Sequence, residues 1–152
     1  MAYGDIGGSR PELIITMRAA LAKDEAGAII PIRRGDAVTL CDPACVSHDS
    51  ALDPTVGYWV TNTPRGVDAG SPVVGMAISD CKEQAAHVPI IVRGLAHLRI
   101  GKMHGPGTPG GYLVTMDPDA PGAVEMFKLD GAPRVLFQTR ERNGSTVAEI
   151  LI

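Results

Sequence analysis

Apolar side chains alternate with polar ones along residues 87–100, HVPIIVRGLAHLRI. The even positions carry apolar residues or glycine, whereas His87, Arg93 and His97 lie among the odd positions. A period of two is the side-chain period of a β-strand. The stretch therefore predicts one long strand, or two strands joined by a bend at Gly94, with the even face buried. Because the odd face is mostly polar, we expect an antiparallel sheet with one dry face.

Further short apolar runs, each bounded by Gly, Pro or Asp, predict that most of the chain is strand. They cover residues 28–33, 37–41, 56–61, 73–79, 112–115 and 123–129. Neighbouring side chains of a strand point to opposite faces, so one of Tyr58 and Trp59 must point inward, and we expect it to be Trp59. The 18 glycines and 12 prolines among 152 residues cut the chain into short elements. We predict an all-β, mainly antiparallel fold, a small β-barrel or sandwich.

A hairpin is expected at the end of the chain, where residues 135–142 and 145–152 flank Asn143 and Gly144. This pair suits a two-residue type I′ turn because both residues tolerate positive φ. The turn pairs Arg142 with Ser145 and fixes the register of the two strands. It would place four pairs opposite each other: Thr139 and Ala148, Gln138 and Glu149, Phe137 and Ile150, Val135 and Ile152.

The first 12 residues are rich in glycine and predict an extended arm. Residues 11–27 space Leu13, Met17 and Leu21 as in an amphipathic helix, with Ser9 as N-cap. The β-branched run Ile14–Thr16 favours a strand instead, so an extended segment is the alternative to a short helix. We therefore assign residues 1–25 to an N-terminal arm with an optional short helix, and 26–152 to a β-barrel domain.

Charge and hydropathy exclude several classes of protein. The net charge of −3 gives no basic surface for nucleic acid, so we expect no nucleic-acid partner. No stretch of about 20 apolar residues is present, and no basic start precedes an apolar signal core. We expect that the protein does not associate with membranes and that it is synthesised in the cytoplasm. The three cysteines do not form a disulfide framework, so we expect free thiols.

Candidate chemistry is sparse. Cys41, Cys45 and His48 could supply three zinc ligands, but a structural zinc site needs a fourth, and we favour a buried thiol and a loop histidine. Asp117 and Asp119 resemble the start of a calcium loop, yet Lys128 occupies the position of the bidentate glutamate. The glycines near Lys102 do not have phosphate-loop spacing, and no serine or cysteine lies in a nucleophile signature. We predict no catalytic residue, no metal site and no cofactor, and we assign the aspartates to turns.

The order of these patterns resembles the head decoration, or capsid cement, proteins of tailed bacteriophages. The resemblance runs from about Gly35 to Ile152 through GDAVTL, PVVGMAISDCKEQAAHVPIIVRGLAHLRI, GGYLVTMDPDAPG and a final NG hairpin ending in EILI. It implies a small β-barrel or β-tulip-like domain, often a homotrimer, that sits on the virion surface, bridges subunits of the major capsid protein, and has no enzymatic activity. Its motifs are strand and turn signatures, with no catalytic fingerprint.

Such proteins commonly use an N-terminal arm to reach a neighbour, and a flexible segment can become ordered on docking. We expect the partner contacts to come from the apolar residues Tyr3, Ile6, Leu13, Ile14, Met17 and Leu21. Deleting residues 1–25 should then leave the β body folded. The alternatives are a small trimeric β-barrel enzyme of the nucleotide hydrolase type, whose expected glycine-flanked aspartate is missing here, and a binding module on a phage tail or fibre.

Overall fold

The computed structural model describes residues 12–41, 58–63, 71–105, 110–128, 134–142 and 145–151. These residues form strands and no helix, so the all-β prediction is confirmed. The strands are β1 (Leu13–Ala19), β2 (Ala37–Leu40), β3 (Trp59–Thr61), β4 (Gly75–Ala77), β5 (His87–Arg93), β6 (Leu95–His104), β7 (Gly110–Met116), β8 (Val124–Lys128), β9 (Arg134–Arg142) and β10 (Ser145–Leu151).

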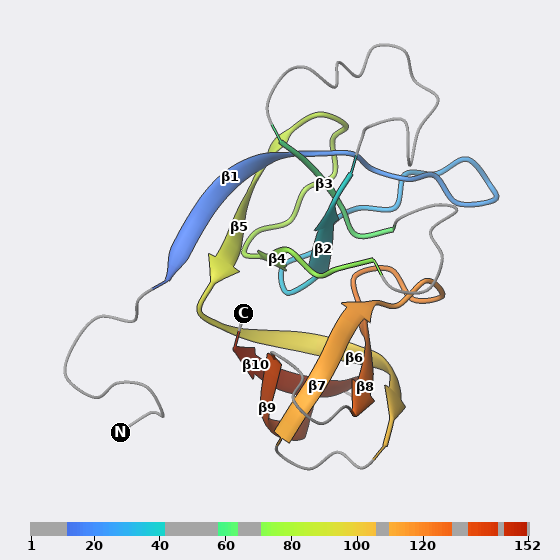
Figure 1. Ribbon diagram of the computed structural model, residues 1–152. Coiled ribbons are helices and arrows are strands. Elements are labelled where there is room, and N and C mark those ends of the chain that lie inside the picture. Colours follow the sequence, from blue (N-terminus) through green and yellow to red (C-terminus); the bar gives the residue numbers. More distant parts are fainter. Residues whose placement is uncertain are drawn as a thin grey trace.

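The strands close into two barrels that follow one another along the chain (Figure 1). The first has the strand order β1-β3-β2-β4-β5, and the second has the order β10-β6-β8-β7-β9. Pairing is antiparallel except between β1 and β3 and between β6 and β8. The predominance of antiparallel pairing was predicted, whereas the division into two barrels was not.

The alternating run 87–100 forms β5 in the first barrel and β6 in the second. Val88, Ile90, Ala96 and Leu98 on its even face are all fully buried, as predicted. The two strands separate at Gly94, whose φ of 132° lies in a region that side-chain-bearing residues rarely adopt. The predicted bend therefore carries the chain from one barrel into the next.

The N-terminal apolar segment is a strand and not a helix. β1 pairs antiparallel with β5 from Leu13 to Arg18, so the helical alternative for this segment was wrong. The reason is local: Ile14, Ile15 and Thr16 are β-branched and pack well on a pleated sheet. Residues 28–33 also differ from expectation, since only Ile29 and Ile32 form isolated bridges there.

The C-terminal hairpin has the predicted register over most of its length. Arg142 lies opposite Ser145, Thr139 opposite Ala148, and Gln138 opposite Glu149. The register then shifts between Glu149 and Ile150, so that Ile150 lies opposite Leu136. Phe137 opposite Ile150 was therefore a wrong prediction, because an irregularity of this kind adds a residue to one strand only. The Asn143–Gly144 turn, and Ile152 opposite Val135, fall outside the described residues.

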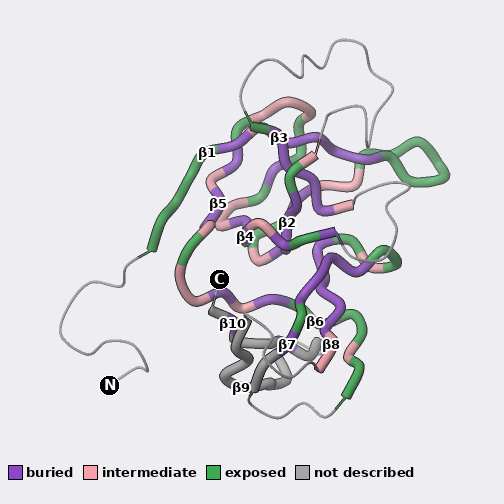
Figure 2. Tube along the Cα trace, viewed as in Figure 1, coloured by how far each residue is buried: buried purple, intermediate pink, exposed green. Residues whose placement is uncertain are grey.

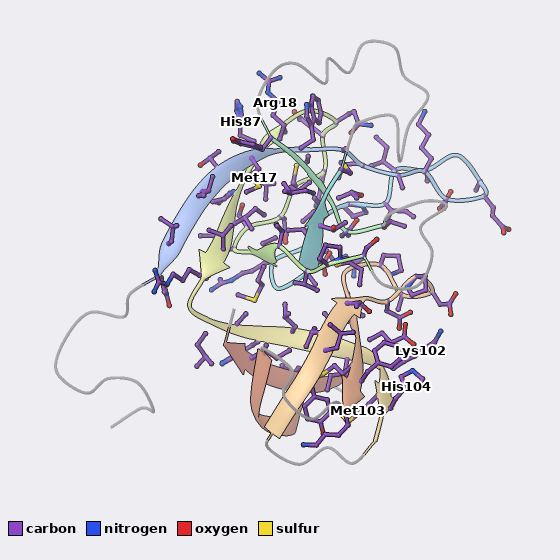
Figure 3. The ribbon with its side chains drawn as sticks, viewed as in Figure 1. Met17, Arg18, His87, Lys102, Met103 and His104 are labelled. Atoms are coloured by element: carbon purple, nitrogen blue, oxygen red, sulfur yellow. The ribbon has the colours of Figure 1, made fainter. Side chains whose placement is uncertain are left out.

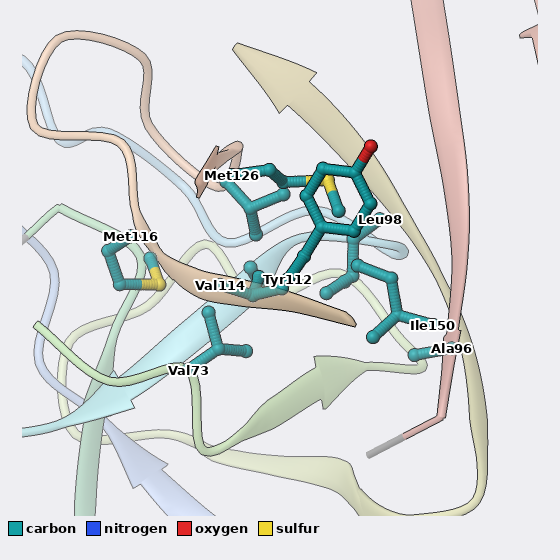
Figure 4. Packing of buried hydrophobic residues seen from close by; sticks show 10 residues of the cluster. Val73, Ala96, Leu98, Tyr112, Val114, Met116, Met126 and Ile150 are labelled. Atoms are coloured by element: carbon teal, nitrogen blue, oxygen red, sulfur yellow. The ribbon is translucent and has the colours of Figure 1, made fainter. Parts of the chain in front are cut away.

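Each barrel has its own core, and the tube in Figure 2 shows the buried positions following the strands of both. The first core includes Met17, Leu21 and Ile90. The second core is built around fully buried Tyr112, with Leu98, Val114, Met116, Met126 and Ile150 (Figure 4). Ala37 and Val73, which precede the second barrel in the chain, belong to this second core as well. The two barrels therefore share apolar contacts.

Candidate functional site

The first half of β1 exposes three consecutive apolar side chains. Leu13, Ile14 and Ile15 are 51%, 47% and 37% exposed, and this stretch is drawn as exposed in Figure 2. β5 pairs with one edge of β1 from Leu13 to Arg18, whereas β3 pairs with the other edge only at Arg18 and Ala19. Within the described part of the chain, the second edge has no strand beside it before Arg18. We call Leu13–Met17 with this edge the β1 edge.

The exposure of Ile15 follows from this missing neighbour. Ile15 lies opposite Ile90 and Met17 lies opposite Val88, so both face the interior of the first barrel. Met17 is buried in the core, but Ile15 lies further toward the open end of the barrel. No other strand among the described residues covers it there, so an inward-facing isoleucine remains partly exposed.

The structure divides the six predicted contact residues. Leu13 and Ile14 are exposed and can reach a partner. Met17 and Leu21, also predicted as partner contacts, lie in the core of the first barrel, where their apolar side chains fill this chain's own interior. Tyr3 and Ile6 lie outside the described residues. Ile15 was missed, although strict alternation from Met17 would have placed it on the inward face at the barrel mouth.

A positively charged group lies where β1 meets β3. The Arg18 guanidinium carbon lies 5.9 Å from the centre of the Trp59 ring, within the range of a cation–π interaction. His87 of β5 is the cross-strand neighbour of Arg18, and both are labelled beside Met17 in Figure 3. Trp59 is buried and Tyr58 is 69% exposed, as predicted for neighbouring strand residues.

A buried carboxylate connects the two barrels. Asp36, which precedes β2, is 3% exposed. Its carboxylate accepts hydrogen bonds from the Arg33 backbone N–H (2.9 Å), Asn62 Nδ2 (2.9 Å) and Arg99 Nη2 (3.1 Å). Arg99 belongs to β6 and also donates to the Pro121 carbonyl oxygen (2.8 Å). The bond to Arg33 is the local turn interaction expected of an aspartate, but the other two bonds join distant parts of the chain.

Gly122 packs directly against the Asp36 carboxylate. A Cβ atom at this position would overlap the carboxylate, and the φ of Gly122 is +74°. Its backbone N–H donates to the Asn62 carbonyl, and its carbonyl accepts from the Ala37 N–H. We call Asp36, Asn62, Arg99 and Gly122 the inter-barrel hub. Asp36 and Arg99 are 63 residues apart, so no local sequence signal could have linked them.

A second group of charges lies on the second barrel, where β6 and β8 run side by side. Lys102 forms ion pairs with Asp117 and Asp119, and the hydrogen bond that Lys102 donates to the Asp119 carboxylate raises the pKa of the lysine. His104 Nε2 lies 2.7 Å from Glu125 Oε1, and its ring stacks on Phe127 with centroids 4.5 Å apart. Lys102 and His104 project from this side in Figure 3.

The cysteine-rich segment can be judged only in part. Cys45 and His48 of the zinc hypothesis lie outside the described residues. Among the residues that the structure does describe, no three His, Cys, Asp or Glu side chains are grouped to hold a metal ion. Cys81 is buried beside Ile32 in the first core, and this burial raises the pKa of its thiol.

Comparisons with known proteins assign the chain to no family. No family model, no curated protein and no solved structure matches it. The described residues also contain no helix that is long and apolar enough to cross a membrane.

Proposed function

We propose that this protein is a structural, non-enzymatic component of a tailed-bacteriophage virion. It binds the outside of the assembled capsid and stabilises it by bridging neighbouring copies of the major capsid protein. The observation that carries the proposal is the exposed apolar start of β1, which begins at Leu13, one residue after the N-terminal residues 1–11. Exposed apolar residues that adjoin one another mark interaction surfaces in proteins of this size.

The two barrels form the rigid body that a protein bridging capsid subunits needs. Closed barrels leave few free strand edges, and the hub holds the barrels together through a buried carboxylate. A protein that binds only the assembled shell stabilises it by mass action, and many identical contacts add up over the lattice. No reaction is needed for this role.

The test is co-sedimentation of the purified protein with expanded, empty capsids of the phage that encodes it. We expect binding by the full-length protein and weaker binding by a variant that lacks residues 1–11. This deletion replaces removal of residues 1–25, because residues 13–25 include β1 and core residue Leu21, whose loss would open the first barrel. Circular dichroism of the shortened variant should match that of the full chain.

A pair of point substitutions shows whether capsid binding depends on the apolar surface of β1 or is weakened by any added negative charge. Full burial of an isoleucine stabilises a contact by about 1.5–3 kcal/mol, and Ile14 has about half of its surface to lose. Ile14→Asp should therefore weaken capsid binding by about four- to twelvefold. Leu113→Asp is the matched control, since Leu113 is similarly exposed (42%) on β7 of the other barrel. Equal binding by all variants, or no co-sedimentation of the full-length protein, would contradict the proposal.

A further inference from the structure

The backbone of the β1 edge is directed toward a position that no strand of the described residues occupies. The Ala19 N–H donates to Ala86 on the β5 side, whereas the Arg18 N–H donates to Tyr58 on the β3 side. Successive backbone groups of a strand point to opposite edges, so Ile14 and Thr16 point the same way as Arg18, away from β5. Thr16 lies opposite Pro89, which has no N–H to offer, in agreement with this direction.

This edge lacks the features that usually protect a free strand. Residues 13–17 read LIITM and contain no charge, no proline and no glycine. Proteins commonly protect exposed edges with lysine, proline or a bulge, because an unprotected edge is a template for another strand. In Figure 1 the start of β1 stands at the outer side of the first barrel, with no labelled strand beyond it. An added strand would pair with its backbone groups and would lie beside its apolar side chains, which stay on the two faces of the sheet.

We propose that the β1 edge pairs with the same edge of a second copy of this chain. The two strands run antiparallel about a twofold axis at Ile14, so that Glu12 of each copy faces Thr16 of the other. The edge is complementary to itself because its two ends carry opposite charges. In this register Glu12 of one copy lies diagonally beside Arg18 of the other, within reach of long side chains. Leu13 and Ile15 of both copies then form one continuous apolar row.

The pairing stops where β3 begins. The Tyr58 carbonyl already accepts from the Arg18 N–H, so a partner strand cannot pair beyond residue 16. Beside residues 12–16, no strand of the part that the structure describes occupies this edge. A register centred on Ile14 is the one that fills this room symmetrically, as a twofold contact requires. The pair would bring two N-terminal segments to one place, which favours bivalent attachment to a lattice. It does not depend on the proposed capsid role and can be measured on the protein alone.

Oligomeric state gives the first test. Light scattering after gel filtration of the full chain, from about 5 to 200 μM, should show a dimer. Ile14→Lys places two like charges on the axis and should give a monomer at every concentration, whereas Leu113→Lys should remain dimeric. Circular dichroism should report folded protein for both variants, because both side chains are solvent-exposed.

Two further variants test the register and the direction of the backbone. Ile14→Cys places two thiols across the axis at about 5.5 Å between Cα atoms, a separation suited to a disulfide. Mild oxidation should cross-link this variant at least tenfold faster than Leu113→Cys, which carries the same three native cysteines. Thr16→Pro removes an N–H that points away from β5, so it should abolish the dimer while the barrel stays folded.

Several results would overturn the proposal. They are a monomer or a trimer in the full chain, a dimer that survives Ile14→Lys, and equal cross-linking by the two cysteine variants. Protection of the Ile14 and Thr16 amides from hydrogen exchange in a monomeric sample would show that another part of the same chain covers the edge. A dimer that fails to bind capsids would refute the proposed function and leave this inference standing.

Discussion

Replacing Asp36 with alanine should destabilise the protein far more than replacing its charged partner Arg99. The two side chains form one ion pair at 3.1 Å, but their surroundings differ. The Arg99 side chain is 44% exposed, and ion pairs in contact with water contribute about 0–1 kcal/mol. The Asp36 carboxylate is almost fully buried and also bonds to the Arg33 N–H and to Asn62 Nδ2.

The magnitude follows from these partners. Loss of the partly buried bond to the Arg33 N–H costs about 1 kcal/mol, and leaving a hydrogen of the buried Asn62 amide unpaired costs about 1–3 kcal/mol. With a small share from Arg99, we expect Asp36→Ala to lower the free energy of unfolding by about 3–4 kcal/mol. Asp36→Asn keeps the shape of the side chain, but its amide NH2 would face groups that are themselves hydrogen-bond donors. We therefore expect a loss in the free energy of unfolding between those of the other two variants. Arg99→Met should cost less than about 1 kcal/mol.

Equilibrium unfolding in urea, followed by the fluorescence of buried Trp59, measures these differences. For a slope near 2 kcal/mol/M, Asp36→Ala should move the midpoint by about 1.5–2 M to lower urea, with the slope unchanged. A loss below about 1 kcal/mol for Asp36→Ala would refute the reasoning. So would an equal loss for Arg99→Met, since the exposed ion pair would then account for the whole effect.

Three other outcomes can be checked with the same preparation. Gly122→Ala should lower the free energy of unfolding by about 2 kcal/mol or more, because the φ of this residue is positive and an added Cβ would overlap Asp36. In a double-mutant cycle, part of this loss should disappear when Asp36 is also replaced by alanine. Strictly additive losses would argue against the contact. Ile90→Ala in the first core and Leu98→Ala in the second should each lower the free energy of unfolding by about 2–5 kcal/mol. Both variants should unfold in a single transition, because the barrels share the hub. Separate transitions in calorimetry would show that the barrels unfold independently. The raised pKa of Cys81 means that the folded state holds the thiol proton more tightly than the unfolded state does. The contribution of this thiol to stability should therefore be present at neutral pH and decrease as the pH rises above the ordinary thiol pKa. If iodoacetamide labelled Cys81 as fast in the native protein as in urea, the burial of this residue would be contradicted.

Much of the fold could be predicted from local pattern. The alternation across residues 87–100 gave the buried face of two strands, and the neighbours Tyr58 and Trp59 were assigned to the correct sides. These predictions succeeded because the side-chain period of a strand depends only on backbone geometry. The register of the C-terminal hairpin was correct up to Glu149, because the two-residue connection between Arg142 and Ser145 fixes which residues pair. The predicted register was wrong at Ile150, because the irregularity there depends on how the second barrel closes and has no local sequence signal.

The candidate sites show the same division. Leu13, Ile14, Met17 and Leu21 were all predicted as partner contacts, because helical spacing also fits this segment. The structure exposes the first two and buries the other two. A partner strand decides between the two structures, and β5 lies about 70 residues away in the chain. The role of Asp36 beyond its turn was missed because Arg99 reaches it from the other barrel.

The sequence by itself determined that this chain is built of short strands, that the bend lies at Gly94, and that the even face of residues 88–98 is largely buried. These features follow from side-chain alternation, β-branching and turn residues, which act over a few positions. Only the tertiary structure decided that the strands close into two barrels, that Asp36 joins them, and that, among the described strands, β3 pairs with β1 only from Arg18 onward. Those features depend on which distant strands meet, and strand pairing is set by the packing of the whole chain.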